Sequence, residues 1–179
     1  MSINLDKELS KAIDYFGERY GAAETSYDRL PVSTHNKPFA QTLVDDNNKT
    51  IAVKVTETAK IAQQRYQLWH EAVHCLAPVP RMDTLWFEEG LAVYSTLNVP
   101  HMKNAYRSAC IADLRAAPLW YEPWQSFKKL NPTHPKIKEI HELAPQRRFD
   151  NITAQLIVDI FGVSSALAVE LCQRLPVNR

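Results

Sequence analysis

The chain has 179 residues, 45% of them hydrophobic, which is enough for one ordinary domain whose core can bury a site. Its 21 basic and 20 acidic residues nearly cancel and neither sign forms a long run, which argues against nucleic acid or an anionic membrane as a partner. Because the chain has no stretch of roughly 20 apolar residues, no signal-peptide pattern at its start and only three widely spaced cysteines, we expect a cytoplasmic protein without a disulfide framework.

The first elements along the chain are a helix and a pair of strands. Apolar residues at helical spacing predict an amphipathic helix over 4–20, with Asn4 as its N-cap and Gly21 just after its end. Residues 38–56 predict two short strands around an Asp-Asn turn. In the second strand apolar residues alternate over 51–55, so one face of that strand is expected to be buried.

Two helices follow in the middle of the chain. A long helix is predicted over about 57–77 and is expected to end before Pro78, because proline cannot continue a helix. A second helix is predicted over about 85–97, with Asp83 or Thr84 as its N-cap.

The last part of the chain is expected to be helical around a proline-rich stretch. Five prolines between 118 and 145 predict irregular structure there, interrupted by one short helix. The helices expected in this part cover 103–117, 134–143, 150–161 and 164–175, the last two separated by Gly162. The fold class that follows is α+β, mostly helical, with a small N-terminal sheet.

Residues 69–76 read WHEAVHCL and contain the pattern of a metal site. On a helix, residues four apart lie one turn apart on the same face, so His70 and His74 can present two imidazoles to one ion. Glu71 is rotated by about 100° from His70, where it can reach a water on the metal as a general base without being a ligand. The alternative is a solvated polar stripe on the helix.

The next helix supplies the candidates for a third ligand, which a catalytic zinc site normally needs beside its water. Glu88 and Glu89 point about 100° apart, so we do not expect both to serve one ion. Glu89 shares its helix face with mostly apolar residues, and a carboxylate buried there needs a partner such as a metal. The alternative is that the helix end frays and both glutamates are solvated.

The pair HEAVH and WFEEGLAVY resembles the HExxH and WxxEGxAxY motifs of the gluzincin metallopeptidases, which include the M1 aminopeptidases and the peptidase MA-like families. The resemblance covers 50–97. It implies that His70, His74 and Glu89 bind one Zn²⁺ per chain, that Glu71 is the catalytic general base, and that the substrate is a peptide or protein.

The same resemblance implies a scaffold. The chain would be a single zincin-like domain over 1–179, with a helix, a small sheet and the HExxH helix in 1–77 and a helical part in 78–179. The strand before the HExxH helix, TIAVKVT at 50–56, would be an edge strand that borders the active-site cleft and binds extended substrate through backbone pairing. An ordinary sheet member is the alternative for this strand.

The chain departs from the family pattern in four respects. Only 14 residues separate His74 from Glu89 and no GxMEN motif precedes them, so aminopeptidase activity is not implied. Val93 stands where thermolysin-like proteins have an aspartate, and Phe149 stands where family members often have the tyrosine that stabilises the oxyanion. We prefer Tyr121 or His141 as replacement donors; the other candidates are His101, Tyr106, His134, Arg147 and Arg148.

These motifs and departures leave three alternative functions. The first is a zinc metallopeptidase, the second is a zinc-binding module of the same fold without peptidase activity, and the third is a helical protein without metal. The strength of the two motifs favours the peptidase.

Overall fold

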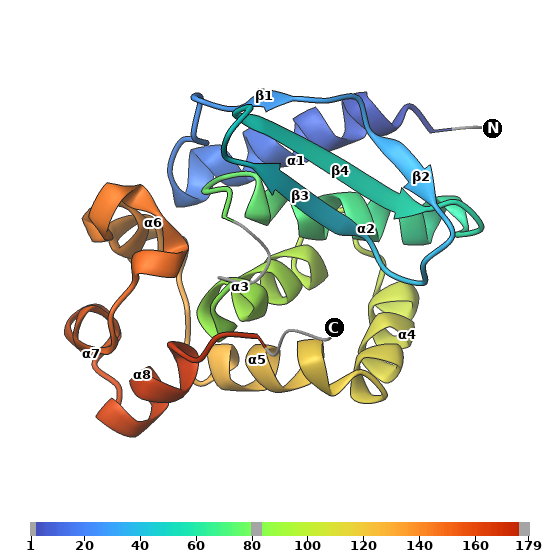
Figure 1. The fold of residues 1–179 in the computed structure, drawn as a ribbon. Coiled ribbons are helices and arrows are strands. Elements are labelled where there is room, and N and C mark those ends of the chain that lie inside the picture. The colour runs from blue at the N-terminus through green and yellow to red at the C-terminus, as the bar shows by residue number, and fades with distance from the viewer. Residues whose placement is uncertain (1–2, 80–83, 176–179) are drawn as a thin grey trace. The chain divides into compact units, whose positions relative to one another are not determined.

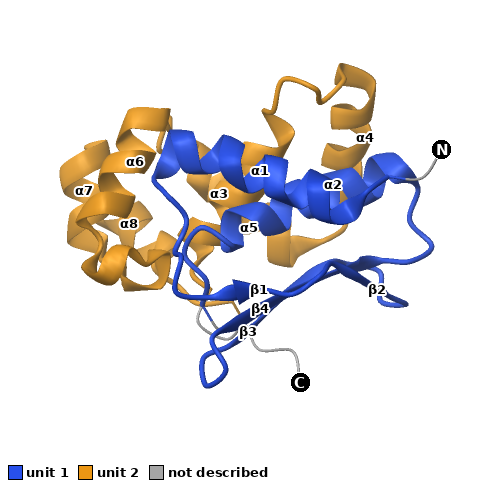
Figure 2. Cartoon of the chain, turned by 90° about the horizontal axis from the view of Figure 1, so that it is seen from above, with its two compact units in different colours: residues 1–81 blue, residues 82–179 orange. Residues whose placement is uncertain are grey.

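The computed structural model describes residues 3–79 and 84–175 of the chain, so Pro80 and Asp83 lie outside the described residues. The chain divides into two compact units, residues 1–81 (unit 1) and residues 82–179 (unit 2), which are coloured in Figure 2. The expected α+β class is confirmed, because helices predominate and the strands form one small sheet in unit 1 (Figure 1). None of the described helices is long and apolar enough to cross a membrane.

The sheet of unit 1 is built around its last strand. Its strands are β1 (Asp28–Arg29), β2 (Ser33–His35), β3 (Gln41–Asp45) and β4 (Thr50–Thr56). Both β1 and β3 pair with Thr50 and Ile51, and both β2 and β3 pair with Lys54. A strand has two edges, and at each edge a residue can pair with only one neighbouring strand. Because β3 shares paired residues with β1 and with β2, β3 must lie along one edge of β4, and β1 and β2 must lie along the other. Strand β4 is therefore central, and β3 is an edge strand of the described sheet.

This order corrects one prediction. The strand at 50–56 was expected to be the edge strand, but its backbone is paired on both sides, in parallel with β1 and β2 and antiparallel with β3. The sequence did not predict β1 or β2, because these strands have only two and three residues and lack a buried apolar alternation.

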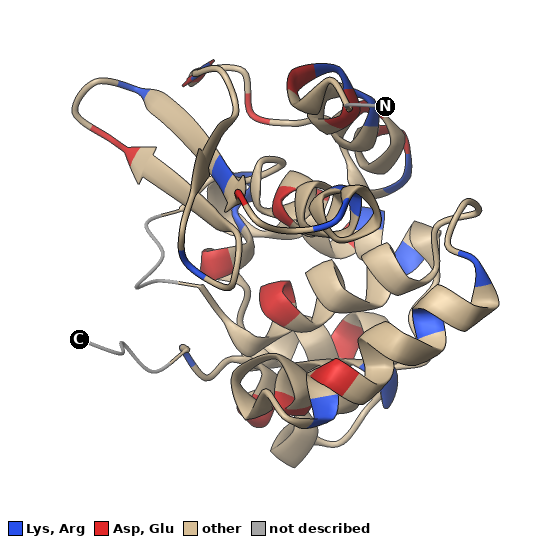
Figure 3. Cartoon of the chain, turned by 90° about the vertical axis from the view of Figure 1, so that its right-hand side faces the viewer, with Lys and Arg blue, Asp and Glu red and all other residues tan. Residues whose placement is uncertain are grey.

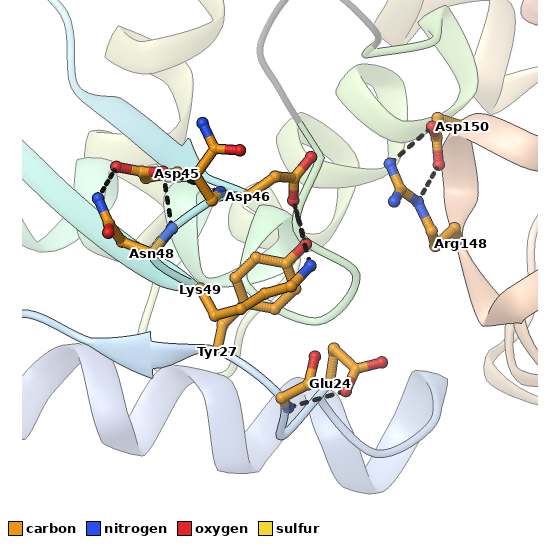
Figure 4. A network of polar contacts seen from close by, with 10 residues as sticks. Glu24, Tyr27, Asp45, Asp46, Asn48, Lys49, Arg148 and Asp150 are labelled. Atoms are coloured by element: carbon orange, nitrogen blue, oxygen red, sulfur yellow. Dashed lines mark hydrogen bonds and ion pairs between the residues drawn. The ribbon is translucent and has the colours of Figure 1, made fainter.

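The turn between β3 and β4 follows the predicted Asp-Asn pattern. The backbone N–H groups of Asn47 and Asn48 both donate to Asp45 Oδ1 at 3.0 Å. Lys49 then adopts a left-handed φ of 52°, and Asp46 accepts a hydrogen bond from the Tyr27 hydroxyl (Figure 4). These side-chain bonds satisfy the backbone donors of the turn, so the hairpin forms where the sequence predicts it.

Helix α1 (Leu5–Tyr20) forms as predicted. The Asn4 side chain accepts from the backbone N–H of Lys7 at 2.9 Å, and Gly21 ends the helix at a positive φ of 110°. The buried face of the helix carries Leu9, Ala12, Ile13, Phe16 and Tyr20. Helix α1 contacts α2 (Ile61–His74), and both helices lie on one side of the sheet (Figure 2).

Helix α2 is shorter than the predicted 57–77. Residues 57–59 form a turn instead, in which the N–H of Ala59 donates to the carbonyl of Thr56. The helix ends at His74, before Pro78, and Cys75 is its C-cap. From Gln67 to Val73 every residue of the helix is buried, so this half lies in the core rather than on its surface.

Unit 2 is helical. Its elements are α3 (Trp86–Leu97), α4 (Asn104–Arg115), α5 (Pro118–Lys128), α6 (His134–Leu143), two single 3₁₀ turns η2 (Pro145–Arg147) and η3 (Phe149–Asn151), α7 (Ala154–Phe161) and α8 (Ser165–Leu171). Gly162 ends α7 in the left-handed conformation. The helix predicted over 85–97 is confirmed, but its N-cap is Leu85 rather than Thr84.

The expectation of irregular structure from residue 118 is wrong for its first part. Residues 118–128 form α5, whose first residue is Pro118, a position where the missing N–H costs nothing. Pro123 lies inside the helix, yet Trp124 and Phe127 on the same helix are buried. Burial of this apolar face outweighs the single hydrogen bond that Pro123 removes.

The core of unit 2 is centred on Phe87 of α3. The Phe87 ring centroid lies 5.2 Å from that of Phe127, 6.2 Å from that of Phe149 and 6.3 Å from that of Phe161. These aromatic rings connect α3 with α5, η3 and α7. Acidic and basic residues are interspersed along the elements of both units (Figure 3), in keeping with the balanced composition.

Candidate metal centre

The two histidines of the HExxH sequence lie together at the C-terminal end of α2. The Nε2 atoms of His70 and His74 are 3.3 Å apart, and their ring centroids are 5.1 Å apart. His70 is buried and His74 is half-buried. The helix therefore points the same nitrogen of each ring to one place, as the four-residue spacing predicts.

Glu71, which lies between the two histidines in sequence, is held in place by a hydrogen bond to a residue of the sheet. Its side chain is buried, with 5% of its surface exposed, and its Oε2 accepts a hydrogen bond of 2.7 Å from the Thr42 hydroxyl on β3. A carboxylate this far from water needs donors, and Thr42 supplies one. The general-base candidate is thus placed by a residue of an adjoining strand as well as by its own helix.

The opposite side of α2 is attached to α1. Trp69 Nε1 donates to Glu8 Oε1 at 2.8 Å, and the guanidinium of Arg65 lies 3.0 Å from the same oxygen. The rings of Tyr15 and Phe16 pack edge-on against the Trp69 indole. Trp69 directly precedes His70, so these contacts fix the helix rotation that sets the direction of the histidines.

Gln67 joins α2 to the end of β4. Its Oε1 accepts from the backbone N–H of Thr56 at 3.0 Å, and its Nε2 donates to the Thr56 hydroxyl at 2.9 Å. Gln67 is buried, whereas Gln63, one turn earlier on α2, is exposed. The polar stripe on α2 is therefore not solvated along its length, because one of its members bonds to the sheet.

In unit 2, the first turn of α3 carries the two glutamates considered as a third ligand. Glu88 is 0% exposed and Glu89 is 4% exposed. The alternative in which both are solvated at a frayed helix end is therefore wrong. The apolar setting expected for Glu89 alone holds for Glu88 too, so burial does not separate the two residues.

Gly90 follows Glu89 and lets α3 come close to α5. A Cβ built on Gly90 would lie 2.5 Å from Phe127 Cβ and 2.6 Å from the carbonyl oxygen of Pro123. No larger residue fits without moving one of the helices. The glycine of the WFEEGLAVY sequence thus has a packing reason that lies within unit 2.

Among the His, Cys, Asp and Glu side chains of the described residues, His70, His74 and Glu89 make up the group that could hold a metal ion. The donor set is two imidazole nitrogens and a carboxylate oxygen, which suits zinc. Cys75, next to His74, is a buried free thiol. It lies outside this group.

The candidates for an oxyanion donor all lie in unit 2, and the structure shows what several of them contact. His141 is buried and stacks on Phe149, with their ring centroids 4.7 Å apart. Tyr121 is half-buried with its ring against Trp124. Both residues lie in helices, His141 in α6 and Tyr121 in α5.

The remaining donor candidates are on the surface or engaged in unit 2. His101, His134 and Arg147 are exposed. Arg148 forms a two-pronged ion pair with Asp150 at 2.9 and 3.0 Å (Figure 4). Burial raises the pKa of Tyr106, so its hydroxyl keeps its proton at neutral pH.

Sequence reasoning did not find Thr42. The sequence contained a signal for it, because Thr42 and Val44 are two residues apart and therefore lie on the same face of β3, and Thr42 is the polar one of the two. That face pairs in register with buried residues of β4, Val53 opposite Thr42 and Ile51 opposite Val44. A polar residue at such a position indicates a buried partner, although the pattern does not say which one.

Comparison with models of known protein families, with curated proteins and with solved structures finds no match for this chain.

Proposed function

We propose that the chain is a zinc-dependent metallopeptidase in which His70, His74 and Glu89 bind one Zn²⁺ and Glu71 is the general base. The observation that carries the proposal is the pair of histidine nitrogens, 3.3 Å apart on one face of α2. Glu89 joins them as the buried carboxylate of the candidate ligand group.

The distance between the two nitrogens fits zinc. In a tetrahedral site with Zn–N bonds of about 2.0–2.1 Å, two nitrogen ligands are about 3.3–3.4 Å apart. The observed separation of His70 Nε2 and His74 Nε2 is 3.3 Å.

The chemistry expected of such a site is hydrolysis of a peptide bond. Zinc would supply a water of lowered pKa and would polarise the carbonyl under attack. Glu71 takes the proton of the attacking water and passes it to the leaving amine. Since Thr42 occupies Oε2 of Glu71, the other carboxylate oxygen is the one that we propose takes part in this transfer.

The substrate that we propose is an extended peptide bound along β3. Among the described strands, β4 is the one that pairs with β3, so we propose that the other edge of β3 pairs with the peptide backbone. The hydrogen bond from Thr42 to Glu71 sets β3 beside the general base within unit 1. This assignment replaces the strand at 50–56, whose two edges are both occupied.

The proposal is tested by metal content and by cleavage. Protein purified without added zinc should contain one zinc per chain and should cleave members of a quenched fluorescent peptide library. Glu71→Gln should keep the zinc and lose activity by about 10²–10⁴-fold, the share that proton transfer typically contributes.

The matched control for this experiment is Glu57→Gln, the same chemical change at an exposed residue in the turn before α2. It should leave both zinc content and cleavage unchanged. Absence of zinc from the wild-type protein, or full activity of zinc-loaded Glu71→Gln, would contradict the proposal.

The second candidate function is a zinc-binding module without peptidase activity. Phe149 favours it, because this residue stands where the family that the motifs resemble often has an oxyanion-stabilising tyrosine and is buried against Phe87 and His141. A phenyl ring in the core cannot donate a hydrogen bond to an oxyanion. This function predicts stoichiometric zinc with no cleavage of any peptide in the library.

We also infer that the protein works in a reducing compartment such as the cytoplasm. Cys75, Cys110 and Cys172 are all free thiols. Burial raises the pKa of the Cys110 and Cys172 thiols, which keeps both of them protonated and unreactive.

A further inference from the structure

Thr42 is a polar residue in a position that packing alone would assign to valine. It lies on β3 directly opposite Val53 of β4, and it is 8% exposed. The next residue on the same face of β3 is Val44, opposite the buried Ile51. Valine has nearly the same shape as threonine and a comparable preference for strands, so shape does not explain the hydroxyl.

The hydroxyl has one specific partner. Thr42 Oγ1 donates to Glu71 Oε2 at 2.7 Å, and both side chains are buried. A hydrogen bond to an ionised carboxylate is stronger than one between neutral groups, and exclusion of water strengthens it further. The bond also joins two parts of unit 1 that are 29 residues apart, the edge strand and the HExxH helix.

We propose that Thr42 is a positioning residue for Glu71, whose hydroxyl holds one carboxylate oxygen so that the other is aimed for proton transfer. The inference rests on the proposed function, because it assigns a role in the same reaction. A carboxylate held at one oxygen cannot rotate freely about its last bond. The direction of the second oxygen is then set by the sheet and not by the side chain's own rotamers.

The experiment compares two substitutions at this residue in the full-length zinc protein. Thr42→Val removes the hydroxyl and keeps the shape, whereas Thr42→Ser keeps the hydroxyl. Thr42→Val should lower kcat by about 10–100-fold with KM changed less than about threefold, the size of effect that a misplaced catalytic group produces. Thr42→Ser should restore kcat to within about threefold of the wild type, and both variants should hold one zinc per chain.

Two controls accompany the pair. Thr34→Val makes the same change at an exposed residue of β2 and should leave kcat unchanged. Thr42→Ala also removes the hydroxyl, and its smaller side chain cannot overpack the core. If Thr42→Val folds poorly, kcat is measured in Thr42→Ala instead. A structural role alone would lower the melting temperature of these variants without a selective change in kcat.

Crystal structures of the zinc-loaded variants give a readout that does not depend on activity. The Glu71 carboxylate should leave its wild-type position in Thr42→Val and keep it in Thr42→Ser. An unmoved carboxylate in Thr42→Val, or wild-type kcat in that variant, overturns the inference. A wild-type protein that binds zinc and cleaves nothing overturns the proposed peptidase function instead, and the two crystal structures then decide whether Thr42 positions Glu71.

Discussion

Gly90 and Glu89 are adjacent in sequence but are constrained by different requirements. Glu89 is a buried carboxylate that needs a partner, while Gly90 leaves the room that α3 needs beside Pro123 and Phe127 of α5. The close approach of the two helices, rather than an unusual backbone angle, explains why this position lacks a side chain. The packing role of Gly90 can therefore be tested separately from the proposed binding of metal by Glu89.

Substitution of Gly90 by alanine should destabilise the protein. The new Cβ would lie 2.5 Å from Phe127 Cβ, so α3 or α5 must shift, at a cost of about 1–3 kcal/mol for overpacking. The matched control is Gly17→Ala in α1, where the nearest atom to a new Cβ is 3.9 Å away and alanine should stabilise the helix by about 0.5–1 kcal/mol.

Urea denaturation of the two variants and the wild type measures these changes. Opposite signs for the two glycines are the expected result. Equal effects at Gly90 and Gly17 would contradict the packing explanation and would point to helix propensity instead.

At the scale of an element, the β3–β4 hairpin depends on the Asp45 carboxylate. The backbone N–H of Asn48, followed by its side-chain amide, donates to this carboxylate and lowers the pKa of Asp45. A lowered pKa in the folded state means that the carboxylate contributes stability above its ordinary pKa of about 3.9. That contribution is lost as the pH falls through the lowered value.

Asp45→Ala should therefore destabilise the protein at neutral pH, and the difference from the wild type should shrink in strong acid. Urea denaturation at pH 7 and at the acid end of the stable range measures this difference. Asp45→Asn is the control, since its side-chain oxygen can still accept from the turn but does not titrate. An Asp45→Ala deficit that is the same at both pH values would contradict the role of the charge.

At the scale of the whole molecule, the proposed zinc ion would take three ligands from the folded chain, His70, His74 and Glu89. A ligand that binds only the folded state stabilises it, by about 2.7 kcal/mol when its free concentration is 100 times its Kd. For a chain of this length that corresponds to a rise in melting temperature of about 5–10 °C.

Removal of zinc with a chelator should lower the melting temperature by this amount, and added zinc should restore it. Glu89→Gln should abolish the response and weaken zinc binding by at least about 100-fold, because it removes one of three ligands. Glu88→Gln is the matched control, the same change at the neighbouring buried glutamate of α3, and it should leave the response intact. A zinc response that is lost in Glu88→Gln and kept in Glu89→Gln would contradict the proposal, because it would show that Glu88 is the third ligand.

Elements with strong local signals were predicted correctly. Asn4 and Gly21 lie at the two ends of α1 where expected, and Gly162 ends α7. A cap or a left-handed glycine acts within one helical turn, so the residues that decide it are neighbours in sequence. The alternation in β4 and the Asp-Asn turn predicted the hairpin for the same reason.

Elements decided by packing were predicted less well. Prolines at 118 and 123 suggested irregular structure, but burial of Trp124 and Phe127 makes α5 a helix. Helix α2 was predicted to begin at 57, yet the chain turns after β4 and the helix begins at Ile61. For α5 the local preference is small compared with the apolar surface that the fold buries.

The side-chain chemistry of the candidate site and the common face of His70 and His74 follow from the sequence, because helical spacing brings residues four apart together wherever the helix lies. The central position of β4, the contact of Thr42 with Glu71 and the close approach of α5 to Gly90 become visible in the fold alone. These contacts join segments far apart in the chain. A sequence pattern shows that a residue needs a buried partner, whereas the packing of whole elements selects the partner.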